Sequence, residues 1–244
     1  MLSGSVTLDT ELAARLSDVR ARMARAARRA GRRPDEVRLI AVSKTCPASD
    51  VRAAAAAGQI DFGENRVQEA LQKIEGTADL PLRWHLIGHL QSNKARKAAS
   101  SFACIHSIDS AGLLEAVDRA AADAGRSPEV LVQVDLAREA TKHGAALDAV
   151  RGLVDAARRA RAVRLAGLML LPPFFDDPEA ARPYFRHLRE LRDQLCGSGG
   201  VPPDLVRELS MGMSHDFEVA IEEGATIVRV GTAIFGPRVR PVSA

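Results

Sequence analysis

Lys44 is the residue of this sequence whose type and position most clearly favour chemistry. Only five of the 34 basic residues are lysines, and Lys44 directly follows the apolar, β-branched run at 37–43. In a strand, Ile40, Val42 and Lys44 share one face. Partial burial of that face lowers the pKa of a lysine and leaves a nucleophilic amine, which suits Schiff-base formation with an aldehyde or ketone. The alternative is a lysine that leaves the strand into water.

Two further segments have the composition of an anion site. Gly231 and Thr232 follow the apolar run at 226–230, and Ser214 precedes the helical pattern at 215–223, which it is expected to cap. Helix N-termini offer free N–H groups to an anion, and barrel enzymes often bind phosphate in the loops after strands 7 and 8. These residues favour a phosphate site, with ordinary capping and turn formation as the alternative.

Several other polar residues fall within or just after the apolar runs. Arg229 is a charge inside an apolar strand and needs a partner, either a ligand atom or a structural acid such as Glu64. His85 either faces the pocket or is a hydrogen-bonded core residue. Asp109 and Asp135 either orient a ligand or cap the helices that follow them, and we prefer the caps. No two histidines stand four residues apart with an acid between them, so we predict no metal site.

The residues above can meet only if the elements that carry them end at the same place. Short β-branched runs alternate with helical patterns along the chain. Eight such units in about 200 residues favour the α/β class and a single (β/α)8 TIM barrel, whose chemistry sits at the C-terminal ends of the strands. A doubly wound open sheet would need a Gly-rich turn after the first strand, and none is present. The strands are predicted at 37–43, 60–63, 83–87, 104–108, 130–135, 164–170, 207–211 and 226–230, and the helices at 9–30, 48–57, 65–75, 92–100, 110–124, 145–160, 178–195 and 215–223.

The composition excludes several classes of protein. The 244 residues are 46% hydrophobic, which is enough for a sizeable core. Cys46, Cys104 and Cys196 are scattered, so we expect neither a disulfide framework nor a structural zinc site. The longest apolar run, 165–175, holds two prolines and is too short to span a bilayer. The first residues lack the basic start of a signal peptide, and we expect a soluble, cytoplasmic protein.

Residues 1–33 are rich in arginine and are predicted to form an additional helix. One interpretation is a face for nucleic acid or an acidic partner. The other is the solvated face of a helix that packs on the barrel, and we favour it because no aromatic residues are interleaved with the arginines. We therefore expect one domain over 1–244, with no nucleic-acid or membrane partner. The packing residues of that helix would be Leu12, Leu16, Val19 and Met23.

Six segments, in order and spread over nearly the whole chain, carry a family resemblance. They are VSKT at 42–45, FGENRVQEA at 62–70, WHLIGHLQSNKARK at 84–97, KHG at 142–144, GLM at 167–169 and SMGMSHDFEVAIEEGATIVRVGTAIFG at 210–236. Together they resemble the pyridoxal phosphate homeostasis protein family, also called the YggS or PROSC family. The third and last segments are the longest and most specific.

The resemblance implies a fold and a cofactor. The fold would be a single barrel like the N-terminal domain of alanine racemase, with pyridoxal 5′-phosphate (PLP) held as an aldimine on Lys44. Asn65 would lie near the cofactor and Arg229 beside its pyridine nitrogen. The phosphate would be held by Gly231, Thr232 and a serine of SMGMS, with Ser214 preferred to Ser210. The full set of cofactor-binding residues expected on this basis is Lys44, Asn65, His85, Ser210, Met211, Ser214, Arg229, Gly231 and Thr232.

Three positions depart from the commoner family pattern. Cys46 stands where a lysine is frequent, Leu86 where Phe or Met often follows WH, and Asp135 where Asn is common. These differences concern the rim of the pocket and leave PLP binding as the expectation.

The resemblance also implies a role in PLP (vitamin B6) homeostasis, as a monomer, with PLP-accepting apo-enzymes as candidate partners. In PLP enzymes a carboxylate beside the pyridine nitrogen deepens the electron sink, whereas Arg229 makes it shallower. Alanine racemase supplies an acid/base tyrosine from a second domain, but this sequence ends at Ala244 and its only tyrosine, Tyr184, falls in a predicted helix. We therefore expect no catalytic turnover. A PLP-dependent amino-acid racemase or related enzyme is the alternative, and a PLP-free binding module that uses the Arg-rich helix is a third hypothesis.

Overall fold

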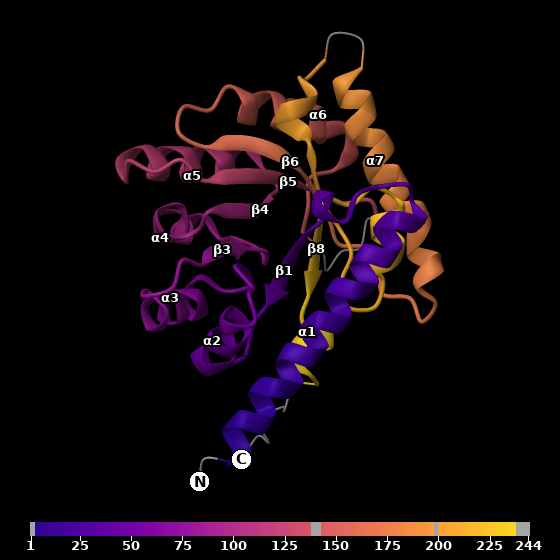
Figure 1. Cartoon of the computed structure of the whole chain (residues 1–244). Coiled ribbons are helices and arrows are strands. Elements are labelled where there is room, and N and C mark those ends of the chain that lie inside the picture. The colour runs from indigo at the N-terminus through magenta and orange to yellow at the C-terminus, as the bar shows by residue number, and fades with distance from the viewer. Residues whose placement is uncertain (1–2, 138–142, 198–199, 238–244) are drawn as a thin grey trace, which may run out of the picture.

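The chain forms a closed barrel of eight parallel strands that neighbour one another in sequence order. The computed structural model describes residues 3–137, 143–197 and 200–237, and Figure 1 shows the strands at the centre with helices around them. The predicted (β/α)8 barrel is therefore confirmed. The strands are β1 (Arg38–Val42), β2 (Asp61–Glu64), β3 (Arg83–Leu86), β4 (Cys104–Ile108), β5 (Glu129–Val134), β6 (Arg164–Leu170), β7 (Glu208–Ser210) and β8 (Ile227–Val230).

The helices follow the strands at nearly the predicted positions. Each strand is an apolar run because it is covered on one side by helices and on the other by the barrel interior. Two predicted helices, at 92–100 and 178–195, begin with short 3-10 turns at Ser92–Lys94 and Pro178–Ala181. The α-helices are α1 (Ser3–Arg29), α2 (Ala48–Ala56), α3 (Val67–Gly76), α4 (Ala95–Ser101), α5 (Ala111–Asp123), α6 (Leu147–Arg158), α7 (Arg182–Cys196), α8 (Phe217–Glu222) and α9 (Thr232–Phe235).

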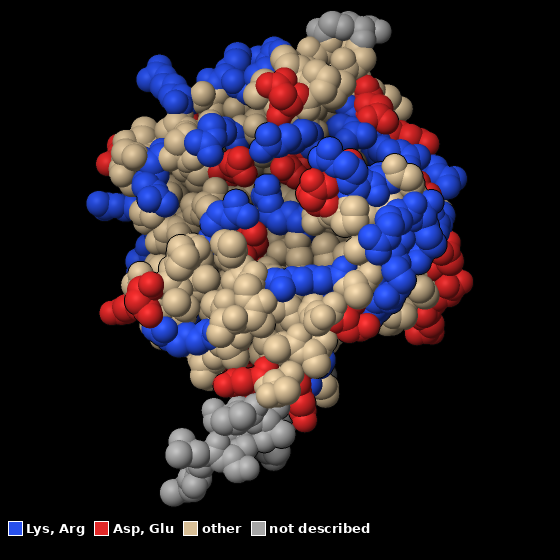
Figure 2. All heavy atoms as spheres, viewed as in Figure 1, with Lys and Arg blue, Asp and Glu red and all other residues tan. Residues whose placement is uncertain are grey.

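The first helix, α1, packs against α8 and α9, which lie near the other end of the chain. Its apolar face is buried, Leu16 completely so. Its polar face forms ion pairs, among them Arg22 Nε to Glu218 Oε1 at 2.7 Å and Arg29 Nε to Glu222 Oε1 at 2.8 Å. Figure 2 shows the basic side chains of this view interleaved with acidic ones. The arginines of α1 named here therefore hold the helix to the barrel.

None of the helices in the described part of the chain combines the length and the apolar composition needed to cross a bilayer.

Candidate functional site

A cavity of about 590 Å³ opens at the C-terminal ends of the strands, within the usual range for small-molecule sites. Lys44 and Arg229 both line it, because β8, which carries Arg229, pairs side by side with β1, whose end Lys44 follows. Six of the nine predicted site residues line this cavity. They are Lys44, Asn65, Ser214, Arg229, Gly231 and Thr232.

Lys44 is half-buried at the point where the chain leaves β1. The next residue, Thr45, has a φ of 68°, a left-handed conformation that is strained for a β-branched side chain. The backbone on both sides of Lys44 is held by side chains. The Thr45 N–H donates to Glu69 Oε1, and the Ser43 carbonyl accepts a 2.7 Å hydrogen bond from Lys73 Nζ.

Lys73 is the centre of a buried ion cluster behind Lys44. Its Nζ lies 2.6 Å from Glu64 Oε1 and 2.8 Å from Glu69 Oε1, and its side chain is only 7% exposed. The Ser43 hydroxyl also donates to Glu64 Oε1, at 2.6 Å. Burial raises the pKa of Glu64, although the bonds from Lys73 and Ser43 oppose the rise. Of the two partners considered for Arg229, a ligand atom or a structural acid such as Glu64, the structure does not show the acid at Glu64, because Glu64 pairs with Lys73.

Arg229 is held by neutral acceptors. Its Nη1 donates to Ser210 Oγ at 2.6 Å, and its Nη2 donates to the Leu170 carbonyl at 2.8 Å. Burial lowers the pKa of Arg229 to about 10, opposed by the charge of Asp216. The guanidinium is therefore still protonated at neutral pH and presents a positive charge at the floor of the cavity.

Ser214 joins the loops that follow β7 and β8. Its Oγ accepts from the Gly231 N–H at 3.1 Å and from the Ala233 N–H at 3.4 Å. The expectation that it caps the helix at 215–223 is wrong, because that helix, α8, begins at Phe217. Asp216 instead stabilises the turn before α8 by accepting the Met213 N–H at 2.6 Å. Ser214 caps α9 across space, which fixes the positions of Gly231 and Thr232.

Three predicted site residues do not line the cavity. His85 is 2% exposed inside the barrel, and its ring contacts Asp61 and His106, so it is a hydrogen-bonded core residue. Ser210 and Met211 are completely buried. The cause lies at Gly212, whose φ of 92° turns the chain so that the following residues reach the cavity. In this geometry neither Ser210 nor Met211 lines the cavity, and the contact of these two residues with a ligand stays a prediction.

The two aspartates predicted as helix caps have other contacts. Ser110 is the cap of α5, accepting the Leu113 N–H at 3.4 Å. Asp109 instead lies 3.5 Å from Nδ1 of His89, which lines the cavity. Asp135 accepts the Ala137 N–H at 3.1 Å, within its own loop.

Sequence reasoning missed several residues of the cavity lining. Gln133 interrupts the apolar residues that follow Glu129 in strand β5, and this interruption was a usable signal. His143 lines the cavity through a long loop, and its ring stacks on that of His89 at 3.6 Å between centroids and 12° between planes. Parallel rings direct their nitrogens side by side instead of at one point, which does not favour a metal ion between them and Asp109. Lys142 of the KHG segment lies outside the described residues. The other lining residues that the prediction did not include are Val42, Ile87, Gly88, Leu171, Pro172, Phe174, Met213 and His215.

Comparison with known proteins finds relatives of one family along nearly the whole chain. Residues 15–239 match the family model described as alanine racemase, N-terminal domain. The pyridoxal phosphate homeostasis protein of Aquifex aeolicus is 44% identical over 224 residues, which cover 92% of this chain and 97% of that protein. Its counterpart in Escherichia coli K12 is 39% identical over 233 residues, or 93% and 97% of the two chains.

The solved structures agree with the sequence relatives. PipY of Synechococcus elongatus, solved with PLP bound, is 42% identical, with a TM-score of 0.79 over 92% of this chain and 100% of that one. Alanine racemase of Corynebacterium glutamicum is 17% identical, with a TM-score of 0.66 over 91% of this chain and 62% of that one. The second likeness concerns the barrel fold alone.

Proposed function

Because the chain belongs to the family of the pyridoxal phosphate homeostasis proteins, we propose that it binds PLP in the cavity at the C-terminal end of the barrel. The observation that carries the proposal is the meeting of an amine and a buried guanidinium, from Lys44 and Arg229, in the lining of one cavity of suitable size.

The donor groups of the cavity fit the chemistry of this cofactor. An aldehyde requires an amine, and Lys44 Nζ is the amine that the described lining offers. A phosphate requires hydroxyl and N–H donors, and Ser214 and Thr232 lie together beside Gly231. A Cβ at Gly231 would lie 3.2 Å from the Val42 carbonyl, so a glycine there lets β8 and β1 approach closely.

Each of these residues has a distinct role in the proposal. Lys44 holds the cofactor covalently, Ser214, Gly231 and Thr232 hold its phosphate, and Arg229 faces its ring nitrogen. A guanidinium has donors and no acceptor, so Arg229 favours an unprotonated ring nitrogen. PLP, when bound, supplies a reactive aldehyde and an electron-withdrawing ring whose pull is weaker when that nitrogen carries no proton.

We propose a holding role without catalytic turnover. Racemisation needs an acid/base group on each face of the substrate, and the tyrosine of this chain, Tyr184, packs against Phe175, 5.8 Å between ring centroids, away from the cavity lining. The protein would act as a cytoplasmic monomer that buffers PLP and delivers it to apo-enzymes. Exchange of the α-proton in D2O across a panel of amino acids tests this role. Exchange at enzymatic rates, lost in Lys44→Ala, would instead establish a racemase-like enzyme.

Borohydride reduction followed by peptide mass spectrometry tests PLP binding. We expect a phosphopyridoxyl group on Lys44 and its loss in Lys44→Ala, whereas Lys97→Ala, which removes an exposed lysine of α4, should retain it. Both variants should show the unfolding transition of the unaltered protein, because neither residue is in the core. A phosphopyridoxyl group on another lysine, or on none, would refute the proposed site.

A further inference from the structure

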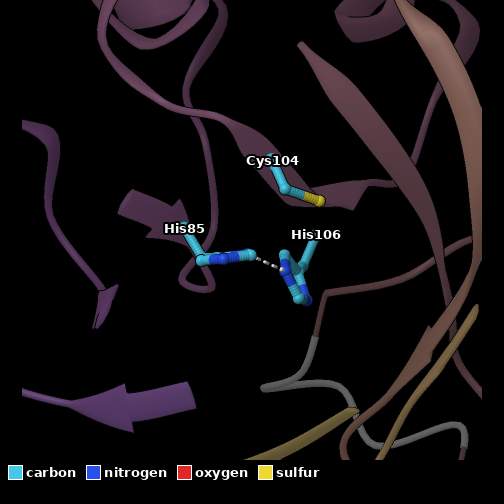
Figure 3. A group of neighbouring side chains, drawn as sticks. All are labelled: His85, Cys104 and His106. Atoms are coloured by element: carbon cyan, nitrogen blue, oxygen red, sulfur yellow. Dashed lines mark hydrogen bonds between the residues drawn. The ribbon is translucent and has the colours of Figure 1, made fainter. Parts of the chain in front are cut away.

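A continuous chain of hydrogen bonds crosses the barrel interior beneath the cavity. Asp61 Oδ1 lies 2.9 Å from His85 Nε2, and His85 Nδ1 lies 3.1 Å from His106 Nε2. The second contact is the dashed line in Figure 3. His106 Nδ1 lies 2.9 Å from Ser210 Oγ, which accepts from Arg229 Nη1. The chain therefore begins at the N-terminal end of β2 and reaches the guanidinium in the cavity.

The two ends of the chain fix where its hydrogens lie. Arg229 can only donate, so the Ser210 oxygen accepts from it and the Ser210 hydrogen is free to go to His106 Nδ1. His106 must then carry its hydrogen on Nε2 and donate to His85 Nδ1. His85 in turn carries its hydrogen on Nε2 and donates to Asp61, a carboxylate that can only accept. This assignment, made from the network, leaves every member satisfied.

Burial of the hydrogen-bond chain favours this order of its hydrogens. His85, His106 and Ser210 are at most 2% exposed. Burial, helped by the nearby charge of Arg229, lowers the pKa of His106 well below its ordinary value, so the ring is neutral. Burial alone would raise the pKa of Asp61, but its bonds from His85 and from Arg83, whose Nη2 is 2.7 Å from Asp61 Oδ2, outweigh burial and lower it.

A metal ion is the competing explanation for part of this cluster. Cys104 brings its sulfur within 4.8 Å of ring nitrogens of His85 and His106 (Figure 3). All four ring nitrogens already have hydrogen-bond partners, however, and a bound ion would break the bond between the two rings. The Cys104 side chain belongs to an apolar cluster, and burial raises the pKa of its thiol well above the ordinary value. The hydrogen-bond chain therefore explains more of the contacts.

We infer that Asp61, His85, His106 and Ser210 are positioning residues that present Ser210 to Arg229 as an acceptor and so fix the guanidinium toward the cavity. In the opposite order, His106 would also donate to the Ser210 oxygen, whose two lone pairs would then be shared between His106 and Arg229, and the oxygen would receive no polarisation from a hydrogen bond donated to His106. The charge of Asp61, at the far end of the barrel, therefore sets how firmly Arg229 is held. The effect on PLP rests on the proposed function, whereas the order of the hydrogens does not.

Asp61→Asn tests the inference because it reverses the chain with little change of shape. Arg83 would donate to the amide oxygen, leaving the amide NH2 to donate to His85 Nε2. We expect nitrogen-15 NMR of the PLP-free protein to show both rings protonated on Nε2 in the unaltered protein and on Nδ1 in Asp61→Asn. We expect PLP to bind roughly tenfold more weakly to the variant.

Two further variants complete the experiment. Asp118→Asn is the matched control, since Asp118 accepts backbone N–H groups of Ala162 and Val163 outside the chain of bonds, and it should change neither readout. Ser210→Ala removes one oxygen and should weaken PLP binding while both rings keep Nε2 protonated. It also serves if Asp61→Asn does not fold.

Two results would overturn the inference. One is an Nδ1 proton on either ring in the unaltered, PLP-free protein. The other is unchanged PLP affinity in Ser210→Ala, or in an Asp61→Asn protein whose rings have switched. Failure of the proposed function would be seen separately, as no PLP on the unaltered protein, and the NMR result would still decide the order of the chain.

Discussion

The Nζ atom of Lys73 lies 2.7 Å from the carbonyl oxygen of Ser43, the residue directly before Lys44. Lys73 belongs to α3, so a helix outside the barrel fixes the backbone that presents the amine to the cavity. Its two acidic partners, Glu64 and Glu69, hold it in place. The reach of Lys44 into the cavity therefore depends on a lysine that does not line it.

Lys73→Met should destabilise the protein strongly, because it leaves Glu64 buried without its cationic partner. Removing one member of a buried ion pair typically costs about 3–5 kcal/mol of unfolding free energy. Urea unfolding measures the loss, and Lys97→Met, an exposed change on α4, should leave it near zero. Adding Glu64→Gln to Lys73→Met should restore part of the stability. An unchanged urea midpoint in Lys73→Met would contradict this account of the cluster.

Ser214→Ala should weaken PLP binding as well as stability. The change removes the acceptor of two N–H groups and costs about 0.5–2 kcal/mol of unfolding free energy, as other helix caps do. The loop at Gly231 and Thr232 would lose its fixed position, so the Kd for PLP should rise on the order of tenfold. Ser110→Ala removes the cap of α5 and should reduce stability without changing the Kd. Equal Kd values for the two variants would argue against the role of Ser214.

Gly88→Ala should disturb the cavity wall between β2 and β3. An added Cβ would lie 2.3 Å from the Asn65 carbonyl oxygen and 2.7 Å from its Cα, so the two loops must separate. Such overpacking costs about 1–3 kcal/mol of unfolding free energy, and reduced PLP uptake should accompany it. In contrast, Gly152→Ala adds a methyl to open space on the exposed face of α6 and should stabilise by up to about 1 kcal/mol. Normal PLP uptake by a folded Gly88→Ala would contradict the prediction.

The unfolding free energy should fall as the pH drops below about 6.5, because His106 is buried in its neutral form. Its pKa is lowered well below 6.5 in the folded state, chiefly by burial, so below pH 6.5 the unfolded chain binds a proton that the folded chain does not. Stability is therefore lost as the pH falls, by at most about 1.4 kcal/mol per pH unit. His106→Gln should remove this component between pH 6.5 and 5, whereas His187→Gln, an exposed change on α7, should keep it. The measurement is the unfolding free energy of both variants across that pH range, and an equal pH dependence in the two variants would contradict the prediction.

The barrel could be predicted because its determinants are local. The β-branched runs and the helical patterns between them are short-range features, and all eight strands lie within one residue of their predicted ends. Lys44 could be placed in the cavity because its face follows from the two-residue period of β1.

The details of the β7 exit could not be predicted because they depend on one backbone angle and on contacts across space. Gly212 turns the chain between Ser210 and Ser214, and no spacing rule indicates which serine faces the cavity. The prediction that Ser214 caps the helix at 215–223 failed for a similar reason, since Ser214 caps a helix that begins 18 residues later. The sequence left Glu64 open as a partner of Arg229, because Lys73 reaches Glu64 from a different element.

The contact between α1 and α9 has a consequence for synthesis of the protein. Arg15 Nε of α1 donates to the Ile234 carbonyl of α9 at 2.7 Å, and α9 begins at Thr232 in the cavity wall. Early in translation α1 has no such partner, because strand β8 and helix α9 have not yet been synthesised. Lys44 is therefore present on the ribosome-bound chain before Gly231 and Thr232, the residues proposed to bind the phosphate. Tight binding of a ligand requires the complete barrel and is expected only after the chain is released.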